Sequence, residues 1–254
     1  MLDIDRQDKI LKILTERKSI TTNELQKLVF ASSSTIIRDL IKMEKQGLIK
    51  RTHGGASIII PKDTESSLTL RVKKNINEKN KIARKVIELI DDNSSIFIDS
   101  STTVQALIPY LSSFKFLTII TNGLNNALLL SAQTSASIYF IGGMVATNSN
   151  SAIGSMAIDT LQKLNADYTI ISAGGVQNNS ITEYSVEQAN VKRMMIKKSK
   201  KTFLLVDSSK FNKINIAQIA RIEEIDYLIS EQEPPQDIME IINKSKCEFI
   251  KAND

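Results

Sequence analysis

The chain is poor in the residues that form covalent or metal cross-links. Its 254 residues include one cysteine, Cys247, one histidine, His53, and no tryptophan. One cysteine cannot form an intrachain disulfide, and one cysteine with one histidine cannot build a zinc site from those two residue types. We therefore expect no metal and a reducing compartment, the cytoplasm.

Long apolar runs are missing as well. No stretch approaches the roughly 18 consecutive apolar residues that a membrane span requires, and the acidic residues 1–6 do not have the pattern of a secretory signal. Hydrophobic residues make up 42% of the chain and charged residues 24%, which is typical of a folded globular protein. The sequence predicts one or two globular domains with no membrane partner.

Positive charge is concentrated near the start of the chain. The net charge is +5, and residues 1–60 account for most of it, with 11 basic and 7 acidic residues. A small basic segment on a nearly neutral body is typical of a polyanion-binding head, with an ordinary solvated surface as the alternative.

Residues 1–60 have the pattern of three helices followed by a hairpin. Apolar residues recur at helical spacing over 4–18, Thr21 and Glu24 form a capping-box pattern, and the hydroxyl residues 32–35 can cap a third helix. Gly47 is placed to end that helix, and Gly54-Gly55 separates two short strands. The pattern predicts a small α+β winged helix-turn-helix domain, with a protein-interaction module as the alternative.

The third helix would enter the major groove of DNA with its first residues at the base edges. Short hydroxyl groups, cations at i,i+4 spacing and donors before the hairpin turn suit contacts with phosphates and bases. These candidates are Ser33, Ser34, Thr35, Arg38 and Lys42 in the helix, and Arg51 and His53 in the hairpin. They favour double-stranded operator DNA as the partner.

Three stretches of this domain resemble the DeoR family of bacterial transcription regulators. They are 34–40, 44–49 and, most specifically, the Arg-Thr-His-Gly-Gly-Ala stretch that starts at Arg51. Family members usually carry a second arginine where this chain has Ile37. The resemblance therefore implies a DNA-binding position at Ile37 that lacks one cationic contact.

From residue 78 onward, apolar strands alternate with helical segments. Strands are predicted at 95–98, 117–120, 137–141, 168–171, 202–206, 226–230 and 247–250, and helices at 78–90, 102–111, 124–132, 158–164, 186–198 and 235–244. This alternation predicts an α/β domain with a mostly parallel sheet covered by helices. Residues 61–77 are interpreted as a linker between the N-terminal domain, 1–60, and this domain, 78–254.

Polar loops follow five of the predicted strands, where ligands of parallel sheets bind. They contain Asp99, Ser100, Ser101, Thr102 and Thr103; Thr121 and Asn122; Gly142 and Gly143; Gly174 and Gly175; and Lys210. Hydroxyl and N–H groups at a helix start can hold a phosphate, and Lys210 can neutralise it. Each loop alone could be a tight turn, but five at one edge favour a small-anion pocket.

These loops extend the resemblance over nearly the whole chain. With Glu187 and residues 191–196, they look like the effector domain of the DeoR family, which is similar to ribose-5-phosphate isomerase and senses phosphorylated sugars. The resemblance implies that residues 100–103 and Lys210 hold the phosphate, and that Asp99, Asn122 and Glu187 face the sugar. Ser101 and Ser180 stand where the family usually has glycine, and Ser180 could change a turn that needs a positive φ.

Two other functions remain open from the sequence. An active sugar-phosphate isomerase needs a positioned base, and the loop that carries carboxylates in the isomerases this domain resembles corresponds here to 172–179, which has no Asp or Glu. A nucleotide sensor would need a glycine-rich phosphate signature, and the sequence has none.

We predict a cytoplasmic regulator rather than an enzyme. It has no cofactor, acts as a homodimer or homotetramer, and represses a sugar-metabolism operon until a phosphorylated sugar releases it from DNA. Two minor expectations concern single residues. Lys192 and Arg193 are predicted to belong to a solvated basic cluster, and Cys247 to be a buried apolar residue.

Overall fold

The computed structural model describes residues 3–45, 48–58 and 68–253, and divides into two compact units, Met1–Arg71 and Val72–Asp254. Each unit has its own hydrophobic core and is described by itself. Within these described residues, every helix is too short or too polar to cross a membrane.

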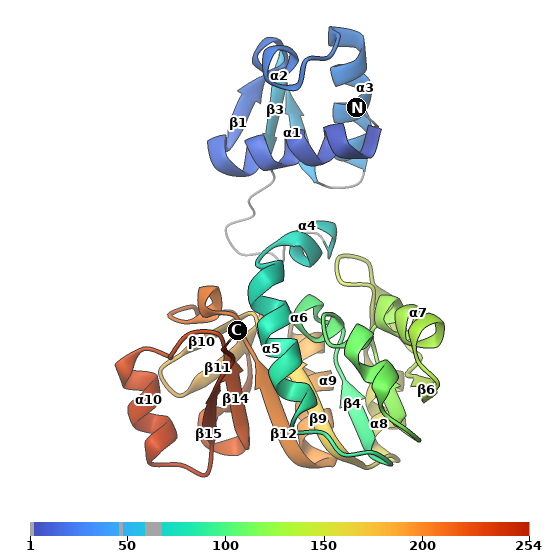
Figure 1. Cartoon of the computed structure of the whole chain (residues 1–254), viewed down its shortest axis with the longest axis vertical. Helices are drawn as coiled ribbons and strands as arrows, with labels where there is room; N and C mark the ends of the chain where they lie inside the picture. The colour runs from blue at the N-terminus through green and yellow to red at the C-terminus, as the bar shows by residue number, and fades with distance from the viewer. Residues whose placement is uncertain (1–2, 46–47, 59–67, 254) are drawn as a thin grey trace. The chain divides into compact units, whose positions relative to one another are not determined.

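The described residues between 3 and 58 form three helices and a three-stranded antiparallel sheet (Figure 1). The helices are α1 (Asp3–Arg17), α2 (Thr22–Val29) and α3 (Ser33–Lys45), and the strands are β1 (Ser19–Thr21), β2 (Ile49–Thr52) and β3 (Gly55–Ile58). The predicted helices and hairpin are present, and β1 is an additional strand that the sequence pattern did not predict. This strand pairs with β3, so that the sheet order is β1-β3-β2. Gly47, the predicted helix stop, lies outside the described residues.

The caps of this unit have the local chemistry that the sequence predicts. The Thr21 side chain accepts a hydrogen bond from the Glu24 N–H, and Glu24 Oε2 accepts one from the Thr21 N–H, which completes a capping box. Ser32 Oγ accepts a hydrogen bond from the Thr35 N–H at the start of α3. The apolar faces of the three helices meet in one core, which contains Leu25 of α2 and Ile36 and Leu40 of α3.

The second unit is built on a seven-stranded sheet in which every strand pair is parallel. Its order is β15-β14-β12-β9-β4-β5-β6. The strands are β4 (Ser95–Ile98), β5 (Thr118–Thr121), β6 (Ser137–Phe140), β9 (Ala166–Ser172), β12 (Ser199–Leu205), β14 (Tyr227–Ser230) and β15 (Glu248–Lys251). The predicted fold class is confirmed.

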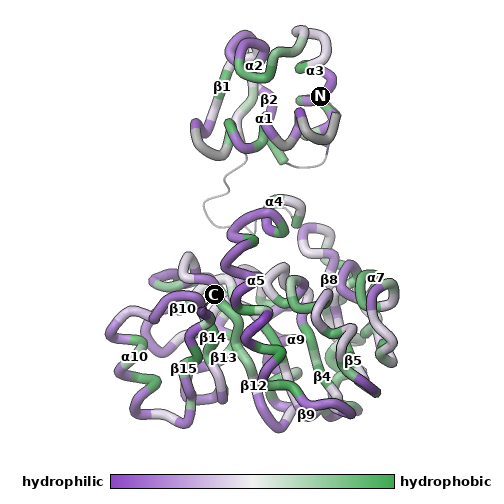
Figure 2. The backbone as a smooth tube through the Cα atoms, in the orientation of Figure 1, coloured by the Kyte–Doolittle hydropathy of each residue, from purple (hydrophilic) through white to green (hydrophobic). Residues whose placement is uncertain are grey.

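Helices cover both faces of this sheet, and side chains alternate between two cores. Ile96 and Ile98 face a core that α5 (Ile76–Ile87), α6 (Thr102–Gln105), a 3₁₀ helix (Ile108–Ser113) and α7 (Leu124–Gln133) cover. Phe97 faces the other core, under α8 (Ser155–Gln162), α9 (Val186–Lys197) and α10 (Gln236–Asn243). The central strands are accordingly hydrophobic along much of their length (Figure 2).

Three parts of the second unit differ from the prediction. The sequence pattern missed a hairpin of β7 (Met144–Ala146) and β8 (Ser151–Ile153). It also missed an antiparallel sheet of β10 (Gly175–Gln177), β11 (Ser180–Glu183) and β13 (Ala217–Arg221). The predicted linker is partly wrong, because α4 (Leu68–Lys73) is helical and α5 begins at Ile76. Residues 61–67 of that linker lie outside the described residues.

Asp167 illustrates how charge pairs hold the amino edge of the large sheet. Its carboxylate accepts hydrogen bonds from Lys200 Nζ at 2.8 Å and from the N–H and Oγ of Ser95. These contacts, first of all the one from Lys200, lower the pKa of Asp167 to about 2. The carboxylate is about one-third exposed, so solvent screens much of this gain.

We expect Asp167→Asn to lower the free energy of unfolding at pH 7 by about 1 kcal/mol. Since the folded pKa of Asp167 is depressed, its contribution is present above about pH 4 and is lost as the pH falls towards 2. Urea unfolding at pH 7, 4 and 3 should therefore show the difference between variant and wild type shrinking. Asp159→Asn, at an exposed position of α8, is the control. A deficit that stays constant down to pH 3 would contradict this prediction.

Candidate DNA interface and effector site

The exposed face of α3 gathers the candidate DNA-binding residues of the first unit. Ser33, Ser34, Ile37, Arg38 and Lys42 are all exposed on this helix, whereas Ile36, Asp39, Leu40 and Met43 are buried. Asp39 is held from α1, where Arg6 Nε donates to its carboxylate at 2.6 Å and Gln7 Nε2 donates at 3.0 Å. The buried face therefore fixes α3 on α1 and leaves a hydroxyl and cationic face for a polyanion.

The remaining candidates of this unit lie close to the same helix. Thr35 is partly buried and its hydroxyl lies 2.8 Å from that of Ser32, so it serves the cap of α3. Arg51 and His53 are exposed around the hairpin turn, in which Gly54 has a φ of +84°. The Arg51 N–H donates to Glu44 Oε1, which ties the hairpin to the end of α3.

Phe30, which the sequence analysis did not single out, is an exposed aromatic residue before α3. Its side chain is 88% exposed, and its backbone is left-handed with φ +54°. The Lys9 ammonium lies 5.6 Å from the centre of its ring. A large residue in this conformation is uncommon. Phe30 stands out only by its exposure and its left-handed backbone in the turn between α2 and α3, and the sequence pattern shows neither of them.

In the second unit, the candidate effector residues lie where the strand order reverses. The chain builds the sheet from β4 outward through β5 and β6, and then from β9 outward in the other direction. Ligands of open parallel sheets bind beyond the carboxyl ends of the strands at such a switch point. Asp99 directly follows β4, and Ser172 ends β9. The Ser172 N–H donates to Asp99 Oδ2 at 3.0 Å across the reversal.

Asp99 is fully buried and all its contacts are within the protein. Its Oδ1 accepts hydrogen bonds from the N–H and Oγ of Ser101 at 2.9 and 2.6 Å. Its Oδ2 lies 3.1 Å from the ammonium of Lys192. The carboxylate therefore orders the loop after β4. The Ser101 N–H is bonded to Asp99, and the Ser101 side chain also caps α6, which is only four residues long.

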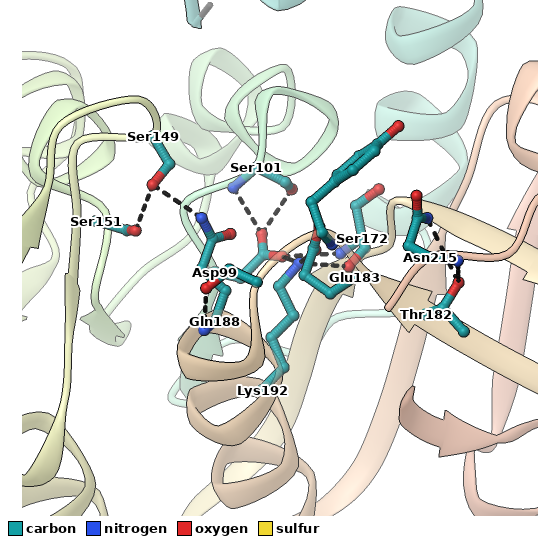
Figure 3. Close-up of polar contacts among 12 residues, drawn as sticks. Asp99, Ser101, Ser149, Ser151, Ser172, Thr182, Glu183, Gln188, Lys192 and Asn215 are labelled. Carbon is teal, nitrogen blue, oxygen red and sulfur yellow. Dashed lines mark hydrogen bonds and ion pairs between the residues drawn. The ribbon is translucent and has the colours of Figure 1, made fainter. Parts of the chain in front are cut away.

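Lys192 joins two carboxylates at the centre of the site (Figure 3). It rises from α9, donates to the Ser172 carbonyl at 2.8 Å, and pairs with Asp99 and with Glu183, which ends β11. Burial alone would lower the pKa of Lys192, but Glu183 and Asp99 outweigh that effect and raise it. The prediction of a solvated Lys192 is wrong, because its neighbours on α9, Gln188, Val191 and Met195, form the buried face of that helix.

A second polar chain lies beside this ion cluster. Gln188 Nε2 donates to Ser149 Oγ at 3.0 Å, and Ser149 and Ser151 share a hydrogen bond of 2.7 Å (Figure 3). Asn122 donates from Nδ2 to the carbonyl of Ala152 at 3.1 Å. Among the described residues, Asn122 Oδ1 is buried without a hydrogen-bond partner. A bound hydroxyl group could supply the missing donor.

Lys210 lies in the loop after β12, in a 3₁₀ turn over Ser208–Lys210. Burial lowers its pKa, although Asp207 and Glu183 act in the opposite direction. Burial would raise the pKa of Asp207, but the hydrogen bond from Ser209 and the charges of Lys210 and Lys79 hold it below its usual value. Within the part of the chain that the structure describes, the Lys210 ammonium forms no ion pair.

Two residues that the sequence analysis did not select, Asn75 and Lys79, join the loops of the site. Lys79, on α5, is buried and donates from Nζ to Thr102 Oγ1 at 3.0 Å. Asn75 Nδ2 donates to Asp207 Oδ1 at 2.7 Å and to Ser209 Oγ at 3.1 Å. Ser100, Thr102 and Thr103 are themselves buried, so the loop after β4 packs under α5.

The structure gives several other candidates a role in the fold. Thr121 Oγ1 accepts from the Gly123 N–H. A Cβ on Gly175 would lie 2.4 Å from the Lys213 carbonyl, and Gly143 has a φ of +140°. Gly174 is buried and Gly142 is exposed. Glu187 is exposed, and the Ser185 hydroxyl, which donates to it, lowers its pKa.

The expectation about Ser180 is wrong. Ser180 lies in β11, and the left-handed residue of that turn is Asn178, with φ +48°. Asparagine adopts this conformation more readily than most residues. The serine therefore leaves the turn intact.

Other features of the second unit do not add to the site. A surface hollow lined by Asp91, Asp167, Tyr168 and Lys200 lies at the amino ends of the strands, on the opposite edge of the sheet. Cys247 is buried, as predicted, and burial raises the pKa of its thiol to about 12. The residues that the structure describes contain no group of three or more His, Cys, Asp or Glu side chains that could hold a metal ion.

Comparison with known proteins identifies similar sequences over nearly the full chain. Residues 6–62 match a model of the DeoR-like helix-turn-helix domain, and residues 74–232 match one of the DeoR C terminal sensor domain. The chain is 34% identical to the HTH-type transcriptional regulator GolR of Listeria innocua over 91% of both chains. It is also 34% identical to the HTH-type transcriptional repressor GlcR of Bacillus subtilis, over 98% of this chain and 96% of that one.

Two more similarities concern a further repressor and an enzyme structure. The chain is 30% identical to the glycerol-3-phosphate regulon repressor of Escherichia coli, over 95% of this chain and 96% of that one. A solved ribose 5-phosphate isomerase A from Methanocaldococcus jannaschii aligns with 54% of this chain and 55% of its own. That alignment has a TM-score of 0.40 and 14% identity.

Proposed function

Because the chain belongs to the DeoR family of helix-turn-helix transcriptional regulators, we propose that it represses genes of sugar metabolism in the cytoplasm until a phosphorylated sugar releases it from operator DNA. The observation that carries this proposal is the pairing of a cationic α3 face in one unit with lysine-lined loops at a sheet switch point in the other. The relatives include a repressor of a glycerol-3-phosphate regulon, which supports the same class of effector.

We propose that α3 reads the operator, with the hairpin beside it. Ser33 and Ser34 begin the exposed face, and Arg38 and Lys42 continue it one and two turns later. Side chains at such positions reach base edges and phosphates when a recognition helix lies in the major groove. Arg51 and His53 of the hairpin would contact the flanking backbone.

We expect Arg38→Ala to weaken operator binding by roughly 1–3 kcal/mol, about 5- to 150-fold, because one exposed cationic contact is lost. The measurement is a salt titration of binding to a duplex that the purified protein selects from a randomised library. A phosphate contact predicts that the salt slope falls by about one. Binding of sugar phosphates to the second unit should not change.

Ile37→Arg is the matched gain-of-function variant. Ile37 is 40% exposed beside Arg38, so an arginine there can reach DNA without displacing core side chains. We expect tighter binding and a steeper salt slope. Unchanged binding by both Arg38→Ala and Ile37→Arg would exclude this face of α3 as the DNA contact.

We propose that the effector binds between the loop after β4 and the loop that carries Lys210. Lys79 and Lys210 supply positive charge there, and the carboxylates of Asp207 and Glu183 partly offset the charge of Lys210. Asn122 Oδ1 can accept a hydrogen bond from a sugar hydroxyl. Asp99 would support the loop from below rather than contact the sugar, since its oxygens are already bonded. We also propose that Glu187, which is exposed, faces the sugar.

A sensor fits this chemistry better than an isomerase. An isomerase needs a carboxylate free to take a proton from the substrate. Asp99 and Glu183 are both paired with Lys192, and each accepts further hydrogen bonds from backbone N–H groups. We therefore propose binding without turnover, and an assay for aldose–ketose conversion by the purified protein should show none above the uncatalysed rate.

Release from DNA requires that the effector bind the free and DNA-bound states with different affinities, and DNA must then weaken effector binding by the same factor. We propose that a homodimer or homotetramer places two α3 helices on repeated half-sites. A thermal-shift screen against sugar phosphates, with the unphosphorylated sugars as controls, tests the effector class. A ligand at about 100 times its Kd stabilises the protein by roughly 2.7 kcal/mol. If no phosphorylated sugar shifts either the melting temperature or operator binding, the proposal is wrong.

A further inference from the structure

The first turn of α5 is bonded to both loops of the candidate effector site. Lys79 reaches Thr102 in the loop after β4, and Asn75 reaches Asp207 and Ser209 in the loop after β12. The Lys79 N–H also donates to the Asn75 carbonyl at 3.0 Å, so the two residues begin the same helix. One short segment is therefore hydrogen-bonded to both loops.

Asn75 has a left-handed backbone conformation. It precedes α5 with φ +54° and ψ +40°, and its side chain makes no capping hydrogen bond to the helix. Asparagine at such a position would ordinarily cap the helix. Here its amide bonds residues more than 130 positions away in the sequence. The left-handed conformation is less favourable for residues other than glycine, so these long-range bonds help to hold it.

The same segment adjoins the chain that leads to the DNA-binding unit. Only Lys74 and Asn75 separate α4, which ends at Lys73, from α5, which begins at Ile76. Residues up to Arg71 belong to the DNA-binding unit. Asn75 therefore lies only a few residues after the boundary between the two units.

An anion at this site would act directly on the partner of Asn75. Asp207 is buried, and Lys79 and Lys210 both stabilise its negative charge. A phosphate drawn to the same two lysines repels the Asp207 carboxylate, because like charges at close range in a buried site repel strongly. It also competes for the Ser209 hydroxyl, which donates to Asp207. Both effects weaken the two hydrogen bonds that hold Asn75.

We propose that Lys79 binds the effector anion together with Lys210, and that Asn75 transmits this binding to the DNA-binding unit. A phosphate group that binds the two lysines releases Asn75 from its hydrogen bonds to Asp207 and Ser209. This inference rests on the proposed function, since it explains how a phosphorylated effector would alter operator binding.

Asn75→Gly tests the transmission step. Glycine adopts the left-handed conformation without strain, so the fold is kept while the side-chain bonds are lost. The probes are glycerol 3-phosphate and glucose 6-phosphate, added to full-length protein bound to its selected operator duplex. In Asn75→Gly, the factor by which saturating probe weakens operator binding should fall about fivefold or more relative to wild type. Probe affinity in the absence of DNA should be retained or rise, because the hydrogen bonds that the phosphate would have to break are already lost.

Asn93→Gly is the matched control, because Asn93 is also left-handed, with φ +61°, but lies on an exposed loop before β4. It should respond to the probes like the wild type. A fully retained response in Asn75→Gly would overturn the transmission role of Asn75 while leaving the proposed function intact. A wild type that does not respond to either probe, or to any other sugar phosphate, would overturn the proposed function and this inference together.

Lys79→Met tests the anion contact. Titration calorimetry with the same probes should show an affinity lower by about tenfold or more, since a charge-assisted contact is lost. Lys85→Met is the control, because Lys85 lies further along α5 and pairs with Glu88 at 2.5 Å. Circular dichroism and melting curves establish that each variant folds. Unchanged affinity in a folded Lys79→Met protein would exclude Lys79 from the anion site.

Discussion

Replacing Lys192 by methionine is expected to lower the free energy of unfolding by about 3–5 kcal/mol, because two carboxylates would remain in the core without a counter-charge. Asp99 and Glu183 are both buried, and each lies within ion-pair distance of the Lys192 ammonium. Methionine fills a similar volume, so the loss reflects charge rather than a cavity. Urea unfolding at pH 7 measures it directly.

The pH dependence separates this explanation from a simple packing defect. Unpaired buried carboxylates have raised pKa values, so they bind protons as the pH falls and the variant should recover relative to wild type. In the wild type, Lys192 has a raised pKa in the folded state, so its contribution is complete at neutral pH. It is lost only as a strongly alkaline pH passes through that pKa. Lys200→Met, which removes an exposed partner of Asp167, should cost less than about 1 kcal/mol.

Adding Glu183→Gln to Lys192→Met should restore part of the lost stability, because one of the two uncompensated charges is removed. A deficit below about 1 kcal/mol in Lys192→Met, or no recovery in the double variant, would contradict a charge-balanced core. Either result would also remove the main argument that Asp99 and Glu183 are unavailable as catalytic bases.

The strands of the large sheet could be predicted because they are buried on both faces. Such strands are continuous apolar runs, such as Ile96 to Ile98, and they stand out against the helices between them. The missed strands carry no such pattern. Strand β7 is exposed along most of its three residues, and β13 alternates buried and exposed positions over only five. Strand β13 exists because β11, more than 30 positions earlier, pairs with it, and no local window contains both strands.

At the centre of the candidate site, the sequence predicted the loops but not the buried ion cluster, which depends on contacts between distant positions. The loops after β4 and β12 could be located, since polar residues that follow apolar strands meet at one sheet edge. Lys192 and Glu183 could not, because Lys192 pairs with Asp99, more than 80 positions away, and Glu183 belongs to the site through its pairing with Lys192. One signal was available in the sequence. Position 192 shares a helical face with Gln188 and Met195, and that face is buried.

Asn75 was missed because it lies in the stretch that was interpreted as a linker, and Lys79 because it lies in the first turn of the predicted helix 78–90. The polar residues before Ile76 carry no apolar period, and Asn75 has no sequence feature that predicts a left-handed backbone bonded to a distant loop. The partly polar face of a first helical turn is normally solvated. Here the residue before that turn, Asn75, is hydrogen-bonded to Asp207, which follows β12 and is distant in the sequence.

Lys210→Ala is expected to lower the affinity for sugar phosphates by roughly 10- to 100-fold, because a charge-assisted contact worth about 1.5–3 kcal/mol is lost. The same variant should fold at least as stably as the wild type. Burial lowers the pKa of Lys210, which means that the folded protein disfavours its charge in the absence of an anion. Loss of binding without loss of stability is characteristic of a group placed for a ligand. Operator binding without sugar should be unchanged.

Two comparisons make this result decisive. Lys213→Ala, at an exposed position three residues later, should retain affinity, because its ammonium is not buried in the site. In the wild type, affinity for the sugar phosphate should fall as the pH rises through the lowered pKa of Lys210, since only the protonated amine attracts the anion. This decline should be weaker in Lys210→Ala. If that variant binds sugar phosphate normally and loses stability instead, Lys210 is a structural residue, and the anion contact must come from Lys79 alone.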